Sequence, residues 1–180
     1  MGLLGFAIAT GLFYGRFSRP RAYLKFSEIA VVAPFEEGSA IMFRVASYKN
    51  NMLSEAEVNI TAAIEENIDG KLVSKFYQIE PTLKKINSFS LNWTLVHKID
   101  SNSPFYGFSE DDFKNTDIEL IIMIKAFDEV FANTVVQRTS YITPEIVYGA
   151  RFLPMYHSSE DNKTTILDLD KIDDYLAVKI

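Results

Sequence analysis

The stretch from residue 56 to residue 65 constrains the fold most, because it places an apolar side chain at every second position. The residues between are polar, with Ala63 as the exception. A period of two buries one face of a β-strand and leaves the other in water. Asp69 and Gly70 then suit the positive φ angles of a tight turn, and residues 72–79 again look like a strand. The sequence therefore predicts a β-hairpin with one buried face.

Seven further segments are strand candidates, and each is bounded by Gly, Pro, Asn or Asp. They are residues 29–33, 40–48, 89–97, 118–127, 134–141, 146–153 and 164–169. Many short antiparallel strands at this spacing indicate an all-β sandwich. Helical signals are few: Ser109 followed by three acids predicts a short helix, and residues 170–178 predict a last one.

Composition fits one folded domain. The chain has 180 residues, of which 48% are hydrophobic, and this argues against disorder. Four bases and no acid precede Glu28, so removing them from the net charge of −6 leaves −10 for the rest. An acidic body argues against sequence-independent nucleic-acid binding, which needs a basic face. The absence of cysteine excludes disulfides and fits a reducing cytoplasm.

The N-terminal segment looks like part of a membrane helix. No charged residue occurs before Arg16, after which Arg19, Arg21 and Lys25 precede the first acid. An apolar helix followed closely by bases is typical of the cytoplasmic end of a membrane span. Fifteen helical residues cover about 22 Å of an apolar layer about 30 Å thick, which is only part of a span. A signal peptide, whose charge should come first, and a buried globular helix are the alternatives.

Catalytic signals are weak. The histidines, His97 and His157, lie far apart in the sequence, and no hydrolase, zinc-protease or phosphate-loop motif occurs. His97 shares its strand parity with Trp93 and Leu95, so we expect a packed, hydrogen-bonded side chain on the wet or interface side of a strand. The sequence therefore predicts no enzyme, no cofactor and no metal site.

Residues 11–21, Gly-Leu-Phe-Tyr-Gly-Arg-Phe-Ser-Arg-Pro-Arg, resemble the end of the inner pore helix and the linker of inward rectifier potassium channels, prokaryotic branch. Other blocks resemble family blocks in the family's order. They are residues 25–32, 42–47, 54–58, 97–107, 137–141 and 147–154. No T-x-G-[YF]-G filter, outer helix or slide helix occurs. The chain thus resembles the cytoplasmic half of such a channel with a stub of inner helix.

The resemblance implies an immunoglobulin-like β-sandwich at residues 28–180, a basic linker at 16–27 and the end of the inner helix at 1–15. It also implies a gating and regulatory domain that forms a homotetramer around an aqueous potassium pathway, on the cytoplasmic side of the cell inner membrane. Magnesium or a polyamine is the expected pore blocker. The alternative is a membrane-tethered β-sandwich that binds a partner and has no pore.

Several pore residues are implied by the same resemblance. Glu55 matches a pore-facing acid whose fourfold ring would concentrate cations, although a solvated strand-edge acid is the alternative. Lys125 immediately precedes an apical loop at residues 126–134, which begins with Ala126 and Phe127, and all three are expected to line the pore. Many family members have an acid where Lys125 stands, so polyamine block should be weakened here.

Two ion pairs are expected at that loop. Asp128 or Glu129 would neutralise Lys125, either within one subunit or across the subunit interface, and Glu129 would pair with Arg138 to brace the loop. An ordinary hairpin tip without a pore role is the alternative interpretation.

The linker residues have implied roles as well. Tyr14 matches an aromatic at the bundle crossing, where four rings would gate by excluding water; an aromatic anchor at the lipid interface is the alternative. The bases would bind anionic lipid such as a phosphoinositide, or would only fix the helix orientation. These bases are Arg16, Arg19, Arg21 and Lys25.

Overall fold

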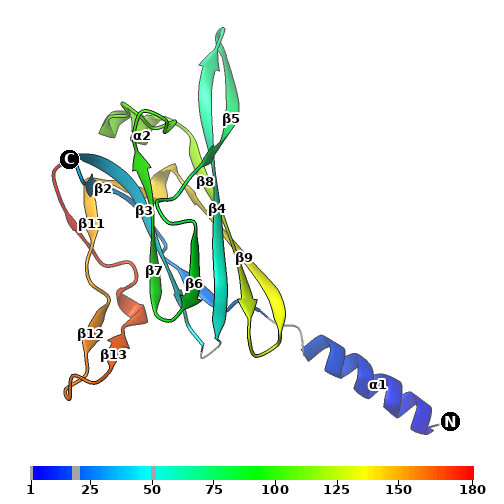
Figure 1. The fold of residues 1–180 in the computed structure, drawn as a ribbon. Coiled ribbons are helices and arrows are strands. Elements are labelled where there is room, and N and C mark those ends of the chain that lie inside the picture. The colour runs from blue at the N-terminus through cyan, green and yellow to red at the C-terminus, as the bar shows by residue number, and fades with distance from the viewer. Residues whose placement is uncertain (1, 18–20, 50–51) are drawn as a thin grey trace.

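Two five-stranded sheets pack face to face and enclose the main core (Figure 1). The structure, a computed structural model, describes residues 2–17, 21–49 and 52–180, without the side chains of residues 3 and 14–17. The first sheet contains β1 (Leu24–Phe26), β2 (Ala30–Phe35), β3 (Gly38–Ser47), β7 (Asn92–Ile99) and β10 (Ile146–Tyr148). The second contains β4 (Leu53–Ile68), β5 (Lys71–Ile79), β6 (Lys85–Phe89), β8 (Ile118–Asp128) and β9 (Asn133–Ile142). The predicted all-β sandwich is confirmed.

The predicted hairpin is the pairing of β4 with β5. Its register closes at Ile68 opposite Lys71, and Asp69 and Gly70 have φ angles of 52° and 79°. The apolar positions of β4 from Ala56 to Ile64 are buried, as the alternation predicted. The end of this hairpin extends beyond the sandwich in Figure 1. Local chemistry therefore determined both the turn and the buried face.

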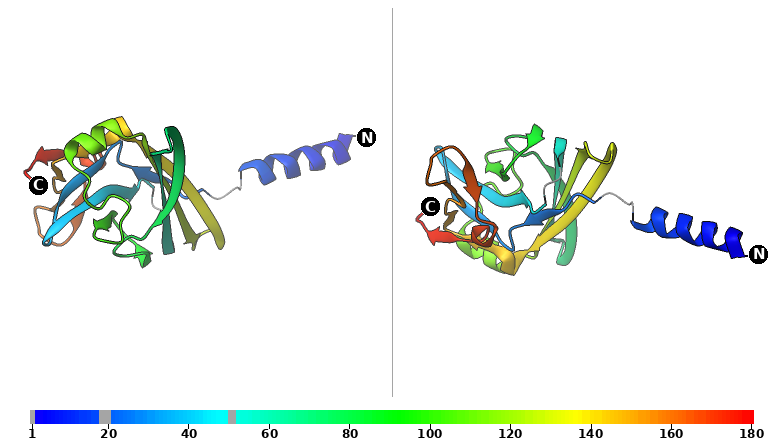
Figure 2. Two further views of the ribbon diagram at one scale, coloured as in Figure 1. Left: turned by 90° about the horizontal axis from the view of Figure 1, so that it is seen from above. Right: turned by 90° about the horizontal axis from the view of Figure 1, so that it is seen from below.

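Short elements complete the fold. They are α1 (Gly2–Phe17), α2 (Glu110–Asn115), two 3-10 turns (Thr143–Glu145 and Leu169–Lys171), β11 (Ala150–Phe152), β12 (Tyr156–Ser158), β13 (Thr165–Leu167) and β14 (Tyr175–Ala177). β11 pairs with β14, and β12 pairs with β13. The C-terminal segment lies outside the first sheet, whereas α1 lies on the side of the second (Figure 2). Ala150 packs with Val31 and Ala33 in a separate apolar cluster.

The last predicted helix is wrong. Residues 170–178 form the end of a 3-10 turn and then β14, because β14 finds a partner strand in β11. The strand predicted at 146–153 is divided at Gly149, whose φ of 69° breaks the extended backbone. By contrast, the short helix after Ser109 is confirmed as α2, and a capping box between Ser109 and Asp112 fixes its start.

The segment predicted as linker includes a strand. β1 begins at Leu24 and pairs with β3, and both Ala22 and Leu24 are buried. Lys25 is half-buried in β1, where its Nζ donates to the carbonyl of Leu169 at 3.1 Å. None of the described helices is both long and apolar enough to span a membrane.

His97 lies inside the fold and not on a wet or interface side. It is 7% exposed, with Nδ1 2.9 Å from the carbonyl of Glu80 and Nε2 2.9 Å from Oγ of Ser103. The segment after β7 folds back over it, so that the Phe105 ring lies 6.5 Å from the imidazole in edge-to-face geometry. The predicted packed and hydrogen-bonded side chain is therefore confirmed, whereas the predicted wet or interface side of the strand is wrong, because His97 is buried together with Trp93 and Leu95.

This burial predicts a pH-dependent stability. Burial lowers the pKa of His97, because the charged imidazolium is poorly solvated there. The unfolded chain then binds a proton more readily, so the free energy of unfolding should fall as pH drops below about 6.5 and level off below the folded-state pKa. Urea unfolding from pH 8 to pH 5 measures this step. His97→Gln should remove it, whereas His157→Gln, at an exposed site on β12, should retain it; equal profiles for both variants would contradict the assignment.

Candidate functional site

The hairpin of β8 and β9 ends in a turn of residues 129–132, here called the apical turn. Asp128 is fully buried at its base, and its Oδ1 accepts the N–H groups of Val130 and Phe131 at 2.9 and 3.1 Å. The N–H of Glu129 donates to the carbonyl of Met52 at 3.0 Å. The turn is therefore shorter than the predicted loop at 126–134, and two sets of hydrogen bonds hold its shape.

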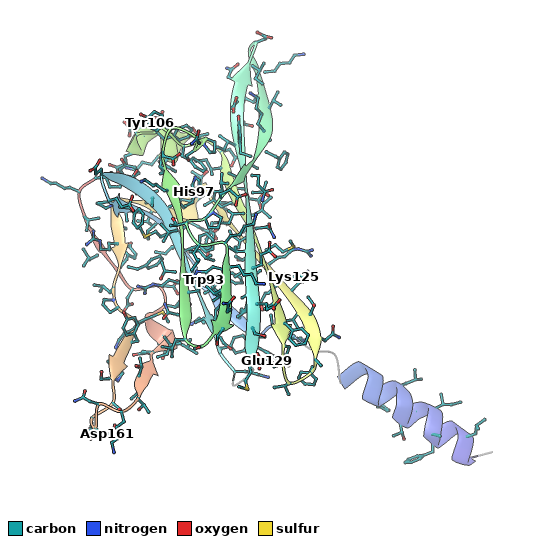
Figure 3. All side chains as sticks on the ribbon, in the orientation of Figure 1. Trp93, His97, Tyr106, Lys125, Glu129 and Asp161 are labelled. Carbon is teal, nitrogen blue, oxygen red and sulfur yellow. The ribbon has the colours of Figure 1, made fainter. Side chains whose placement is uncertain are left out.

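The predicted pore residues on β8 divide between two faces. Lys125 and Phe127 are exposed, but Ala126 is 2% exposed and belongs to the core. Strand geometry requires this, because neighbouring side chains point to opposite faces. Ala126 therefore does not line a surface of this chain. Figure 3 places Lys125 along the strand and Glu129 at its tip.

Charges of opposite sign cross the outer face of the second sheet. Nζ of Lys85 lies 3.4 Å from Oε2 of Glu55, and Glu57 lies opposite both Lys85 and Lys125 in the strand register. Glu55 has a φ of 50° at a β-bulge, which turns its side chain away from the regular alternation. An exposed pair of this kind contributes about 0–1 kcal/mol, so it can exchange partners readily. The carboxylate of Glu55 is thus exposed but already paired.

The predicted brace between Glu129 and Arg138 does not form within the chain. No ion pair joins them among the described residues. The register places Arg138 opposite Met123, whereas Glu129 lies in the turn beyond Asp128 and Asn133. Five strand positions separate Arg138 from that end of the hairpin, which is about 17 Å. The turn is held by Asp128 instead.

Tyr23, inside the segment predicted as linker, makes a compact contact with the β3–β4 connection. Nζ of Lys49 lies 3.9 Å above the Tyr23 ring, and the Tyr23 and Tyr48 rings meet edge to face at 5.8 Å. The N–H of Tyr48 donates to the carbonyl of Tyr23 at 3.1 Å. We call Tyr23, Tyr48 and Lys49 the linker clamp. Local sequence patterns did not indicate a role for Lys49, whose only signal is a base directly after a predicted strand.

The predicted lipid-binding bases have different surroundings. Arg21 is exposed and precedes the linker clamp by two positions, whereas Lys25 is committed to the carbonyl of Leu169. Arg19 and the side chains of Tyr14 and Arg16 lie outside the described residues. Of the predicted set, Arg21 is thus the base that is described and open to a ligand.

The described side chains around the apical turn and the linker clamp offer charge and packing contacts. Within residues 2–17, 21–49 and 52–180, no group of three or more His, Asp or Glu side chains is arranged to hold a metal. His97 is already bonded on both ring nitrogens. The exposed charges can attract ions and anionic groups, and the packed contacts can transmit a displacement from one segment to another.

Comparison with known families and proteins gives consistent matches. Residues 24–180 match the family model of the inward rectifier potassium channel C-terminal domain. Inward rectifier potassium channel Kirbac3.1 from Paramagnetospirillum magnetotacticum is 33% identical over 171 residues, which cover 94% of this chain and 58% of the relative.

Animal proteins are similar as well. Inward rectifier potassium channel irk-1 from Caenorhabditis elegans is 25% identical over 169 residues, covering 89% of this chain and 31% of the relative. ATP-sensitive inward rectifier potassium channel 8 from Mus musculus is 32% identical over 142 residues, covering 76% of this chain and 34% of the relative. The chain thus spans between about a third and three fifths of the length of these relatives.

Proposed function

We propose, since this chain belongs to the inward rectifier potassium channel family and carries its C-terminal domain, that it is the cytoplasmic gating and regulatory domain of a potassium channel. The observation that carries this proposal is the continuous family match over residues 24–180, which follows an uncharged stretch at residues 1–15 and a cluster of arginines. The domain would assemble as a homotetramer under the cell inner membrane, and its role would be mechanical and electrostatic. It would not be an enzyme and would need no cofactor.

The outer face of the second sheet is our candidate for the wall of the cytoplasmic ion path. It carries Glu55 and Lys125, and four copies around an axis would form rings of these charges. Carboxylate rings concentrate cations, whereas a lysine ring opposes them. Since Glu57 and Lys85 lie beside this pair, we expect largely compensated charge and weak block by magnesium or polyamines.

The basic linker is our candidate for the lipid site. Arg16, Arg19 and Arg21 follow the uncharged residues 1–15, and each base near an anionic surface contributes about 1 kcal/mol of attraction. This attraction biases a gate only if its free energy differs between the open and closed states. The linker clamp supplies a rigid point against which a displaced linker can act, because Tyr23 bonds directly to Tyr48. Tyr14, which precedes the linker, is our candidate for the constriction.

A flux measurement tests this proposal. In liposomes, a full-length channel carrying this domain should pass potassium and respond to phosphatidylinositol bisphosphate. Arg21→Gln should weaken the apparent lipid affinity about fivefold, the ratio expected for a loss of about 1 kcal/mol. Arg19→Gln should act in the same direction.

Arg151→Gln is the matched control, because it removes the same charge from an exposed position on β11. An undiminished lipid response in Arg21→Gln would refute the regulatory role of that base. The absence of selective potassium flux from the wild-type protein would refute the channel proposal and favour a tethered binding module without a pore.

A further inference from the structure

Two edge strands from different sheets are joined by a side chain. Gln137 on β9 accepts the N–H of Leu24 on β1 through Oε1 at 3.0 Å, and its Nε2 donates to the carbonyl of the same residue. β1 belongs to the first sheet and β9 to the second, with no strand pairing between them. One amide side chain therefore satisfies both polar groups of a Leu24 peptide edge that β3 does not bind.

A second contact lies four positions further along β9 and reaches the residue directly after β1. The phenol of Tyr141 donates to the carbonyl of Ser27 at 2.9 Å, and the Ser27 hydroxyl accepts the N–H of Arg44 at 3.0 Å. Tyr141 is 1% exposed, so this contact is shielded from water. We call Leu24, Ser27, Gln137 and Tyr141 the β1–β9 seam.

The seam joins two segments that matter for gating. β1 lies at the end of the segment predicted as the basic linker, and β9 follows the apical turn. Gln137 lies four residues after Asn133, where β9 leaves that turn, and Leu24 lies three residues after Arg21. We propose that Gln137 is a positioning residue that makes the linker and the apical turn move together. This inference rests on the proposed gating function and names the contact through which it would act.

Only an amide side chain suits this position. A carboxamide has a donor and an acceptor in one plane, so it reproduces the hydrogen bonds of a neighbouring strand. A glutamate would keep the acceptor and lose the donor, and a leucine would lose both. Removing the partner of a buried backbone group leaves that group unsatisfied, which is the costly case.

Hydrogen exchange of the 180-residue chain tests the contact. In Gln137→Leu, the Leu24 amide should exchange about tenfold faster, roughly as expected for the loss of one hydrogen bond. The Ser27 amide, which donates to the carbonyl of Arg44, should not change. Thr139→Val is the control on the same strand, two positions away. Unchanged exchange of Leu24 in Gln137→Leu would overturn the proposed role of the side chain.

A spin label tests the coupling itself. The chain has no cysteine, so Val130→Cys places a single label on the exposed apical turn. We expect vesicles with phosphatidylinositol bisphosphate to change the label spectrum, whereas vesicles of phosphatidylcholine alone should not. Gln137→Leu should still sediment with the vesicles but lose most of this change, Gln137→Glu should lose part of it, and Thr139→Val should keep it.

These outcomes separate the two proposals. If the wild-type chain does not bind the vesicles, the lipid part of the proposed function is wrong. Normal binding combined with an equal spectral change in wild type and Gln137→Leu would overturn the coupling role of Gln137 alone.

Discussion

Phe113→Ala is expected to lower the free energy of unfolding by about 3–5 kcal/mol, the cost of emptying a large aromatic site in a core. Phe113 is the buried residue of α2. Its ring stacks on Phe105 at 5.6 Å and also meets Phe108 at 5.6 Å and Tyr148 at 5.7 Å. A six-residue helix has little stability of its own, so this anchor holds α2 on the sandwich.

Urea unfolding of the purified chain measures this loss. Tyr106→Ala is the matched control, because it removes an aromatic ring from the same region at a position that is 66% exposed. The control should change the free energy of unfolding by less than about 0.5 kcal/mol. A loss below about 1 kcal/mol in Phe113→Ala would show that the aromatic cluster does not stabilise the fold as its packing implies.

Gly149→Ala should destabilise the chain by about 3 kcal/mol, the sum of a backbone cost and a steric cost. The residue has a φ of 69°, which costs an L-amino acid about 1–2 kcal/mol. An added Cβ would also lie 2.9 Å from the carbonyl oxygen of Val178. The backbone cannot easily retreat, because Gly149 donates to Val32 and accepts from Val178. We therefore expect β14 to detach from β11, which amide exchange of residues 175–178 would detect.

Gly107→Ala separates the two causes of this loss. Gly107 has a φ of 82°, but no heavy atom lies within 4 Å of the position that an added Cβ would take. It should therefore lose only the conformational part, about 1–2 kcal/mol. Equal losses in Gly107→Ala and Gly149→Ala would argue that the close approach to Val178 is not a constraint.

Local patterns predicted the parts of this fold whose causes are local. The alternation in β4, the turn at Asp69 and Gly70 and the capping box at Ser109 each depend on residues within a few positions. The family resemblance extended this to the whole sandwich, and the family match over residues 24–180 confirms it. The burial of Ala126 was also within reach, since it shares parity with Ile122 and Ile124.

Other features depended on contacts distant in the sequence. The predicted helix at 170–178 became β14, because a strand partner in β11 outweighed a weak helical tendency. The predicted pair of Glu129 and Arg138 does not form within the chain, because the hairpin register keeps the two residues apart. β1 is only three residues long and carries no pattern of its own, so its strand state follows from β3.

The sequence by itself determined the fold class, the charge segregation and the basic junction at Arg16–Arg21, because periodicity and charge order are properties of neighbouring residues. Only the tertiary structure decided which of those residues meet. Lys49 reaches Tyr23, and Gln137 reaches Leu24 across 113 positions of chain. The second contact arises because two packed sheets leave edge groups that need partners, and no local pattern in the sequence encodes which side chain will supply either contact.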